Sequence, residues 1–375
     1  MERRPVRIAL LSHELGQGGT DRVGAHLARG FAEAGFTVEL IVLFGSAPAA
    51  ESTLGLVGPN VAVRVLEAGR GSRHLDRLVV LPRLVARLRE IAPDVVFSTG
   101  NNMNLVTALA FHRARLDGAR LVLKTTNPLI RPKDGPARRF VRRIRYGRAF
   151  DRADAVLTLS EAEAEMLCRT FPKAASRIAP VINPYVTPAM LDLPREPDRE
   201  REVILSIGRL APQKRFDMLI RAFAQVREPK ARLVILGEGP QRRSLEALVH
   251  ELGLRDRVSM PGYTPDVGPW LAGARLFALS SRYEGLPAVV LEAMAANCPV
   301  VTTDCFLSAR TLVGEAEGCA VVPDPTPAAL ARAIEGVWSG DRPSTLRAVA
   351  ERFTVEEGIR SHVDLLDDLL RPKTQ

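Results

Sequence analysis

Aromatic side chains are scarce in this chain of 375 residues, since Phe, Trp and Tyr together make up 5% of it. No segment interleaves aromatic and basic residues as nucleic-acid recognition modules do. The net charge of +9 fits three kinds of partner: nucleic acid, an anionic membrane or a phosphate-bearing substrate. The shortage of aromatics makes nucleic acid the weakest of the three, and we expect no nucleic-acid partner.

Cysteine is also rare, and no Cys-x-x-Cys pair occurs among Cys168, Cys298, Cys305 and Cys319. This spacing argues against a zinc site or a disulfide framework and fits a reducing compartment. Long apolar runs are missing too, and no segment of the sequence reaches the length of a membrane span. The N-terminal residues lack a signal-peptide cleavage pattern. We therefore expect a cytoplasmic protein.

Short apolar runs alternate with longer amphipathic segments along most of the chain. With 46% hydrophobic and 25% charged residues, the composition is that of a globular protein long enough for two domains. Apolar periodicity predicts helices, for example over residues 22–34, 78–90, 216–226 and 241–252. We expect strands over residues 6–12, 38–44, 61–66, 95–98, 121–124 and 155–159, and a second series over 203–207, 233–236, 258–260, 276–279, 300–302 and 320–322. This alternation predicts an α/β fold with doubly wound parallel sheets.

One proline-rich stretch, residues 183–198, interrupts the alternation and becomes polar toward its end. It predicts a linker over residues 184–200, between an N-terminal domain of residues 1–183 and a C-terminal domain of residues 201–352. The last amphipathic stretch, within residues 353–375, follows the second series of strands. We expect it to form a helix that packs back on the N-terminal domain.

Two carboxylates lie eight residues apart at Glu284 and Glu292, with Gly285 and Pro287 between them. Residues 288–296 favour a helix, which we expect to begin near Pro287, the first helical position being favoured for proline. The amides and the dipole at this helix end bind anions. Glu292 points toward the same pocket from one turn into the helix, and sugar hydroxyls are suitable donors for a buried carboxylate. The segment predicts a nucleotide-sugar site; the alternative is a plain strand-to-helix turn with Glu292 bound to a backbone amide or an arginine.

A basic loop follows the predicted strand over residues 203–207. Arg209 lies in this loop, and Lys214 falls near the start of the next helix, where the dipole disfavours a cation. A diphosphate held by Arg209, Lys214 and the helix amides would resolve this conflict, because arginine binds phosphate bidentately and lysine binds it as a point charge. The alternative is a solvated basic turn.

Two more predicted strands are followed by glycines. Gly237 and Gly239 either let a ligand approach the backbone or only form a tight strand-to-helix turn. Gly262 precedes Tyr263, which either flanks a base or is a surface tyrosine.

The first predicted strand leads into a glycine-rich loop, residues 16–21, that opens a helix. The loop imitates a dinucleotide-binding loop, but Asp21 stands at the third glycine position, which disfavours a redox cofactor. The bare backbone at Gly18 and Gly19 is still able to approach a phosphate or a sugar. His13 precedes the loop, and a lone histidine at a strand end is more often structural than catalytic.

Together these residues resemble the retaining glycosyltransferases of family 4, which have the GT-B fold. The resemblance covers nearly the whole chain and is most specific over about residues 203–323. The matching segments follow in the family's order: Gly208-Arg209-Leu, Gln213-Lys214, Asp217, Gly237-Glu-Gly-Pro240, Gly262, Ser281, Glu284-Gly-Leu-Pro and Glu292-Ala-Met-Ala. Glu284 and Glu292 match the family's paired glutamates. Gly18-Gly19-Thr matches its N-terminal glycine loop more loosely, and Asn183-Pro184 matches its usual domain junction.

The resemblance implies two Rossmann-like domains that face a central cleft, with a UDP-sugar on the C-terminal domain and a glycan or lipid-linked acceptor on the N-terminal domain. It implies sugar transfer with retention, in the synthesis of a cell-surface polysaccharide or glycolipid. Arg209 and Lys214 would hold the diphosphate in the role of a metal, so we expect no metal or other cofactor. Glu292 would bind the ribose and Glu284 would lie beside the donor sugar, which makes Glu284, Arg209 and Lys214 the expected catalytic residues. The other expected donor contacts are Gly18, Gly19, Gly237, Gly239, Gly262, Tyr263, Gly285, Leu286 and Ala288.

Three departures from the family's pattern affect the site. Asn297 stands where a glycine usually ends the helix, and we expect the turn to survive because asparagine tolerates the left-handed conformation. Residues 306–310 replace a Ser-Gly-Pro-like turn beside the donor sugar. Thr126 takes the place of a histidine that follows the fifth strand in many relatives. The expected acceptor contacts are His13, Asn104, Thr126 and Asn127.

Two alternatives to sugar transfer remain open. One is a nucleotide-sugar-binding GT-B protein without transfer activity, and the other is a GT-B nucleotide-sugar epimerase, which would form its product from the donor alone.

Residues 138–148 and 77–89 alternate arginines with apolar side chains. Helices of this kind can lie on anionic bilayers, which would place the protein on the inner face of the plasma membrane. The alternative is an ordinary solvated helix face over a core stripe.

Overall fold

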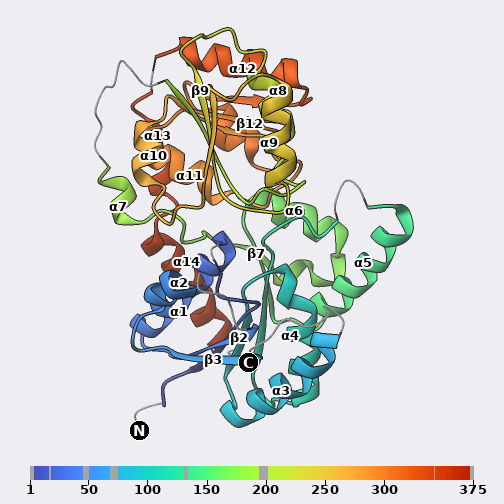
Figure 1. Ribbon diagram of the computed structural model, residues 1–375. Coiled ribbons are helices and arrows are strands. Elements are labelled where there is room, and N and C mark those ends of the chain that lie inside the picture. The colour runs from blue at the N-terminus through green and yellow to red at the C-terminus, as the bar shows by residue number, and fades with distance from the viewer. Residues whose placement is uncertain are drawn as a thin grey trace. The chain divides into compact units, whose positions relative to one another are not determined.

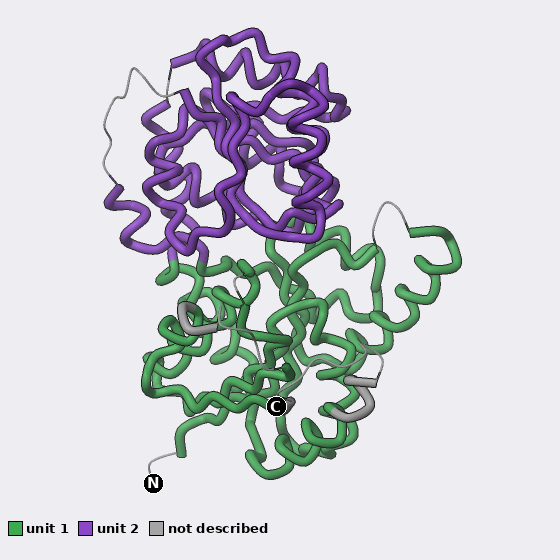
Figure 2. The backbone as a smooth tube through the Cα atoms, in the orientation of Figure 1, with its two compact units in different colours: residues 1–184, 355–375 green, residues 185–354 purple. Residues whose placement is uncertain are grey.

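The computed structural model describes residues 4–16, 18–44, 50–67, 75–130, 134–193, 202–341 and 343–371, without the side chains of residues 50–52, 67 and 75–79. The chain forms two compact units, which Figure 2 colours separately. Unit 1 comprises Met1–Pro184 and Val355–Gln375, and unit 2 comprises Tyr185–Thr354.

Unit 1 is built around a seven-stranded parallel sheet with the order β3-β2-β1-β4-β5-β6-β7 (Figure 1). Its strands are β1 Arg7–Ser12, β2 Thr37–Phe44, β3 Ala62–Glu67, β4 Val95–Ser98, β5 Arg120–Lys124, β6 Ala155–Thr158 and β7 Ile178–Pro180. Its helices are α1 Gly19–Glu33, α2 Ala50–Val57, α3 Leu75–Ile91, α4 Asn101–Ala114, α5 Pro136–Phe150, α6 Glu161–Thr170 and α14 Val355–Leu370, with a 3₁₀ turn at Pro172–Arg177.

Unit 2 contains a six-stranded parallel sheet with the order β10-β9-β8-β11-β12-β13. Its strands are β8 Val203–Ile207, β9 Arg232–Leu236, β10 Val258–Gly262, β11 Leu276–Leu279, β12 Val300–Thr303 and β13 Ala320–Val322. Its helices are α7 Pro188–Leu191, α8 Phe216–Phe223, α9 Arg242–Glu251, α10 Gly268–Gly273, α11 Ala288–Ala295, α12 Pro327–Ser339 and α13 Leu346–Glu351, with a π turn at Arg310–Gly314.

The central strands of both sheets are buried along their whole length. Every residue of β4, β6, β11 and β12 is buried. Such continuous burial is expected of parallel strands that helices cover on both faces. In unit 1, Leu10 of β1 pairs with Leu40 on one side and with Phe97 on the other, so apolar residues meet across the middle of the sheet.

The C-terminal helix α14 belongs to unit 1, where it packs against α1. A glycine makes this close approach possible, since a Cβ built on Gly30 would lie 2.4 Å from Cδ1 of Ile359. The amide of Ile182 also donates a hydrogen bond to Ser361 Oγ at 3.1 Å. The helix is therefore tied both to α1 and to the segment after β7.

The predicted α/β fold with two parallel sheets is confirmed, and β4, β8, β11 and β13 have the expected bounds. Strand β7 was not predicted, because three residues that end in a proline carry no strand pattern. The segment predicted as a linker does not stand wholly outside the two units. Residues 185–193 belong to unit 2, where α7 contacts α11, and residues 194–200 lie outside the described residues.

Candidate active site

The loops that follow the strands of unit 2 meet at one edge of its sheet. Parallel strands all end on the same side, and ligands bind where the strand order reverses. In unit 2 this reversal lies between β8 and β11. The loops after these two strands are joined by Ser280, whose hydroxyl donates to the carbonyl of Lys214 at 2.8 Å.

Lys214 and Glu284 form an ion pair between these two loops. The Nζ atom of Lys214 lies 2.7 Å from Oε1 of Glu284, and the two side chains are 18% and 10% exposed. Ser281 Oγ donates to the same carboxylate oxygen at 2.6 Å. Gln213 Nε2 lies 3.4 Å from the other oxygen. Three donors thus fix the position of the Glu284 carboxylate.

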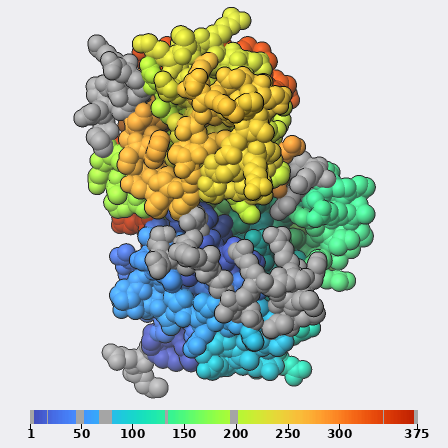
Figure 3. Space-filling view, viewed as in Figure 1, coloured from blue at the N-terminus to red at the C-terminus, as the bar shows by residue number. Residues whose placement is uncertain are grey.

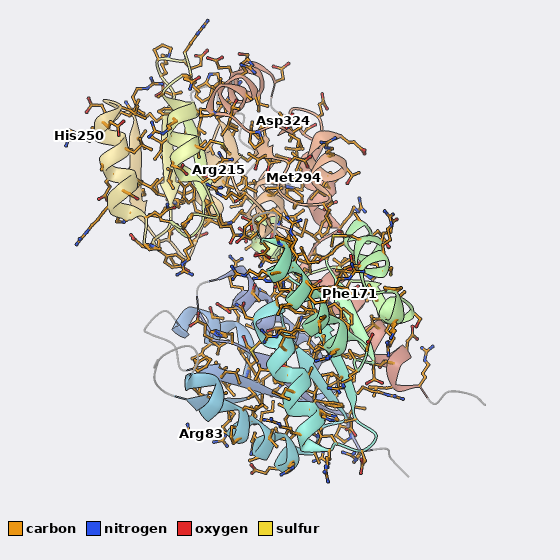
Figure 4. All side chains as sticks on the ribbon, turned by 90° about the vertical axis from the view of Figure 1, so that its right-hand side faces the viewer. Arg83, Phe171, Arg215, His250, Met294 and Asp324 are labelled. Carbon is orange, nitrogen blue, oxygen red and sulfur yellow. The ribbon has the colours of Figure 1, made fainter. Side chains whose placement is uncertain are left out.

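Glu284 resolves the electrostatic conflict that the sequence predicted at the start of α8. The helix begins at Phe216, two residues after Lys214, and Arg215 precedes it in the left-handed conformation with φ of 50° (Figure 4 labels Arg215). We expected a diphosphate to compensate the lysine at this position. In the structure the compensating anion is the Glu284 carboxylate, so a bound phosphate would share Lys214 with Glu284, while Arg209 is exposed on the loop.

The backbone around Glu284 is held by the loop after β12. The amide of Glu284 donates to the carbonyl of Cys305 at 2.7 Å, and Thr303 Oγ1 donates to the carbonyl of Ser281 at 2.7 Å. Burial, together with the nearby Glu284 charge, raises the pKa of the Cys305 thiol to about 12. Cys305 therefore acts as a protonated, structural residue in this loop.

Helix α11 carries the second glutamate of the pair. Its first helical residue is Ala288, so Pro287 is the residue just before the helix rather than its first position, a correction of one residue. Glu292 lies one turn into the helix and is 1% exposed, while Met294 further along is fully buried (Figure 4). The first amides of a helix have no partner within it, so those of Ala288 and Val289 are directed at the end where the loop of Glu284 arrives.

Tyr185 is a residue of this site that the sequence did not reveal. Its hydroxyl donates to the carbonyl of Leu286 at 3.0 Å, and the side chain is 7% exposed. It lies in the proline-rich segment that predicted a linker, and no sequence pattern there assigns a tyrosine to a binding site. Tyr185 thus supports the backbone between Glu284 and α11.

The glycines after β9 are explained by packing between loops. A Cβ on Gly237 would lie 2.0 Å from the carbonyl oxygen of Gly208, and one on Gly239 would lie 2.4 Å from that of Leu210. The side chain of Lys214 packs over Gly208, since a Cβ built on Gly208 would lie 3.0 Å from Cε of Lys214. These glycines therefore bring the β8 and β9 loops together, and a direct contact with a donor stays a prediction.

At the end of β10, Gly262 has φ of 106°, and its carbonyl accepts a hydrogen bond from the amide of Gly237 at 2.7 Å. Tyr263 is 40% exposed, which leaves both interpretations of this tyrosine open. Gly285, the remaining predicted glycine, lies in the loop between Glu284 and α11.

Two of the departures from the family's pattern have a clear structural outcome. Asn297 ends α11 in the left-handed conformation with φ of 51°, as predicted, and its Oδ1 accepts a hydrogen bond from the amide of Arg347 at 3.0 Å. In the loop after β12, Phe306 is 4% exposed and Arg310 pairs with Asp304 at 2.8 Å. The turn at the end of α11 is thus preserved with asparagine. In the loop after β12, a buried ring and an ion pair stand where the family has its Ser-Gly-Pro-like turn.

In unit 1 the glycine-rich loop is organised by its own carboxylate. The amides of Gly16 and Gly18 donate to Oδ2 of Asp21 at 3.1 and 3.3 Å, and Gly19 begins α1. Burial raises the pKa of Asp21 to about 6. His13 lies at the end of β1, with its ring 5.1 Å from that of Phe44. In this structure Asp21 occupies the position at the Gly18 amide where we expected a ligand.

Asn104 does not lie on a loop as expected, and its predicted contact with the acceptor stays a prediction. It lies within α4, not on a loop, and is fully buried. Its Oδ1 accepts from Ser98 Oγ at 2.7 Å, and its Nδ2 donates to the carbonyl of Lys124 at 3.0 Å. Thr126 and Asn127 are half-buried in the loop after β5, so the predicted acceptor contact stays a prediction for these two residues.

The second basic segment, residues 77–89, is largely engaged within unit 1. Arg87 pairs with Glu39 at 2.5 Å and with Glu90 at 2.7 Å. Arg89 donates to the carbonyls of Ala114 and Arg113. These contacts hold both arginines against unit 1, and a membrane contact of this segment stays a prediction. The side chain of Arg77 lies outside the described residues.

Within the described ranges, no three His, Cys, Asp or Glu side chains are grouped so as to hold a metal ion. In that same part of the chain, no helix combines the length and the apolar character needed to cross a bilayer.

Comparison with protein families matches both halves of the chain. Residues 18–184 match the model described as "Glycosyl transferase 4-like domain", and residues 194–352 match "Glycosyl transferases group 1". The chain belongs to the family 4 glycosyltransferases. The two matches together span nearly the whole length of this glycosyltransferase.

One relative of the glycosyltransferase is the N-acetylgalactosamine-N,N'-diacetylbacillosaminyl-diphospho-undecaprenol 4-alpha-N-acetylgalactosaminyltransferase of Campylobacter jejuni. It is 28% identical over 324 residues, which cover 83% of this chain and 84% of the relative.

Solved structures establish the fold of the glycosyltransferase as GT-B. HepE of Anabaena, in complex with UDP and glucose, superimposes with a TM-score of 0.76 at 21% identity, covering 97% of this chain and all of that one. A variant of TarM of S. aureus, in complex with fondaparinux, α-GlcNAc-glycerol and UDP, gives a TM-score of 0.81 at 13% identity, covering 96% of this chain and all of that one.

Proposed function

We propose that this glycosyltransferase moves a sugar from a UDP-sugar to a glycan or lipid-linked acceptor, with retention of configuration, in the synthesis of a cell-surface polysaccharide or glycolipid. The observation that carries the proposal is the Lys214–Glu284 pair at the carboxyl edge of the unit 2 sheet, directly before the helix that carries Glu292. A cation, a carboxylate and a helix start at one strand reversal are what a diphosphate-linked sugar requires.

Lys214 and Arg209 supply the charge for the leaving diphosphate. A lysine ammonium has three donors, so Lys214 is able to bind a phosphate oxygen while it keeps Glu284. Arg209 is exposed in the same loop and offers a guanidinium. Two cations aimed at the charge that develops on the leaving group lower the barrier without a metal, and we propose metal-independent transfer.

Retention then follows from attack on the face from which the diphosphate leaves. The acceptor hydroxyl forms its bond to the anomeric carbon as the bond to the phosphate oxygen breaks, and the hydroxyl proton passes to that oxygen. Glu284 already accepts from Lys214, Ser281 and Gln213. A carboxylate with three donors is a poor nucleophile, which favours a positioning role for Glu284 over a covalent intermediate.

The relatives support the choice of substrates. The name of the Campylobacter enzyme gives a diphospho-undecaprenol-linked acceptor, and the HepE and TarM complexes contain UDP.

Calorimetric titration tests the donor site. UDP, GDP and ADP are titrated in EDTA into the wild type, Glu292→Ala and Glu292→Gln, with Glu251→Ala, an exposed position on α9, as the control. We expect UDP to bind most tightly, both Glu292 variants to lose about tenfold or more in affinity, and the control to match the wild type. Absence of binding by all three nucleotides would overturn the proposal. With the donor known, product from the donor alone would indicate an epimerase, and binding without UDP release would indicate an inactive binder.

We also propose that α5 contacts anionic membranes. Phe140 and Val141 are 65% and 51% exposed, and Ile144 is 38% exposed, between arginines (Figure 3 shows α5 in green at the right edge). Exposed apolar side chains among arginines suit an anionic bilayer surface. Co-sedimentation should show binding to phosphatidylglycerol vesicles, not to phosphatidylcholine vesicles, and a loss for Phe140→Ser. Equal binding to both vesicle types would contradict this contact.

A further inference from the structure

Unit 1 contains a hollow between α3, α4 and α5 with a volume of about 380 Å³. Figure 4 views unit 1 from the side on which these helices lie. The volume falls within the range of roughly 300–1,000 Å³ that is usual for small-molecule sites. None of the predicted site residues lines this hollow.

One side of the hollow is aliphatic. Its wall is formed by Leu81, Leu105, Val106, Leu109 and Leu129. Three of these side chains, all on α4, are open to solvent: Leu109 is 40% exposed, and Leu105 and Val106 are half-buried. Covering such a surface with an apolar ligand would be favourable, because it removes apolar area from water.

The other side is basic. Arg142 is anchored there, because its Nη1 donates to the carbonyl of Leu129 at 2.9 Å and its Nε lies 3.5 Å from Asp134. Arg145 is exposed one turn further along α5, and within the described ranges its guanidinium makes no ion pair or hydrogen bond. No Asp or Glu is found among the described residues that line the hollow. The hollow is therefore apolar on one side and carries the uncompensated positive charge of Arg145 on the other.

The hollow adjoins the loop in which we expect the acceptor. Asn101 lines it, and its Nδ2 donates to the carbonyl of Asn127 at 2.5 Å while its Oδ1 accepts from the amide of Thr126 at 3.0 Å. The hydroxyl of Tyr146, on α5, donates to the carbonyl of Asn101 at 3.3 Å. A ligand in the hollow would thus lie directly against the support of the loop after β5.

We propose that this hollow binds the phosphate-bearing end of a lipid-linked acceptor, an inference that rests on the proposed function. The phosphate or diphosphate lies on Arg145 and Arg142, and the first carbons of the lipid lie on the aliphatic wall. The chemistry selects this occupant, because a free phosphate would leave the leucines uncovered and a neutral lipid would leave Arg145 unpaired. Arginine's bidentate geometry suits phosphate in particular.

A second hollow on the other flank of α5 provides the matched control. It is lined by Phe140, Arg143, Ile144 and Phe171, among others, and has about the same volume, 390 Å³ (Figure 4 labels Phe171). Arg143 lies on the same helix as Arg145, carries the same charge and is also exposed, but it does not line the first hollow. It therefore separates a defined site from general attraction to a basic helix.

The test is calorimetric titration with farnesyl diphosphate below its micelle concentration, in saturating UDP so that the donor site in unit 2 is occupied. We expect farnesyl diphosphate to bind the wild type, Arg145→Gln to weaken it about tenfold or more, and Arg143→Gln to change it less than twofold. Leu109→Ser should weaken farnesyl diphosphate but not inorganic pyrophosphate. UDP affinity, measured in each variant, should stay unchanged and reports that the fold is intact.

Equal losses in Arg145→Gln and Arg143→Gln would overturn the proposal in favour of non-specific attraction. Pyrophosphate binding as tightly as farnesyl diphosphate would overturn it in favour of a plain anion site. The proposed function fails separately, because it predicts UDP binding whether or not the hollow takes a lipid phosphate.

Discussion

The side-chain nitrogen of Lys124 lies 2.8 Å from Nε2 of His362, which joins two fully buried residues that are 238 positions apart. The other ring nitrogen of His362 lies 2.7 Å from the carbonyl oxygen of Gly358. Because a carbonyl only accepts, Nδ1 carries the proton and Nε2 accepts from Lys124. The pair fastens α14 to the end of β5, directly before the loop of Thr126.

This pair should make the stability of unit 1 depend on pH. Burial lowers the pKa of Lys124 from 10.5 to about 7, and burial and the Lys124 charge lower that of His362 well below 6.5. Between pH 7 and 10.5 the unfolded chain binds more protons at Lys124 than the folded chain does, so stability rises with pH by an amount on the order of 5 kcal/mol. Below pH 6.5 protonation of His362 in the unfolded chain lowers stability further.

Thermal unfolding of Lys124→Met measures the lysine contribution. From pH 7 to 10 the Tm of the wild type should rise steadily relative to the Tm of the variant, because only the wild type gains stability from Lys124 as the pH rises. The exposed Lys230→Met should show no such trend. A difference for Lys124→Met that is constant with pH would show that the lysine is not neutralised by burial.

Much of the fold followed from the alternation of apolar and amphipathic segments, because buried parallel strands such as β8 and β11 are short, continuous and apolar. Pairings between distant residues did not follow. The ion pair of Lys214 with Glu284 joins two loops, and no sequence pattern in either loop predicts that the two residues pair. The same applies to Asn104, a polar residue whose burial is satisfied by Ser98 and the backbone of Lys124.

Lys214→Met and Glu284→Gln should separate the two halves of the central ion pair. Lys214→Met removes the proposed phosphate contact, so it should weaken UDP binding about tenfold or more and lower kcat/KM about 10²–10³-fold. Glu284→Gln removes the negative charge that would compete with a bound phosphate for Lys214, so UDP should bind at least as tightly as to wild type while turnover falls. Calorimetry and initial rates measure both; UDP binding weakened equally in the two variants would show that Glu284 does not compete for Lys214.

Tyr185→Phe should loosen the loop that leads into α11. It removes the hydrogen bond to the carbonyl of Leu286 and leaves the ring in place. We expect a loss of about 1 kcal/mol in the free energy of unfolding and a raised KM for the donor, since the amides at the start of α11 lose their support. Denaturant unfolding and donor kinetics are the measurements. Tyr283→Phe, another buried tyrosine nearby, is the comparison, and an unchanged KM in Tyr185→Phe would assign its hydroxyl to stability alone.

Gly237→Ala should destabilise unit 2 because the new methyl group has no room. Its Cβ would lie 2.0 Å from the backbone oxygen of Gly208, and φ at this position is 139°. Neither the backbone oxygen nor the dihedral is able to yield without moving the loops after β8 and β9, so we expect a loss of roughly 2–4 kcal/mol. Gly336→Ala, inside α12 with no atom within 4 Å of the added Cβ, should instead gain about 0.5–1 kcal/mol. Denaturant unfolding compares the two variants with wild type. A Gly237→Ala protein as stable as wild type would mean that the Gly208–Gly237 contact is looser than in the structure. The loop that positions Lys214 would then be looser as well.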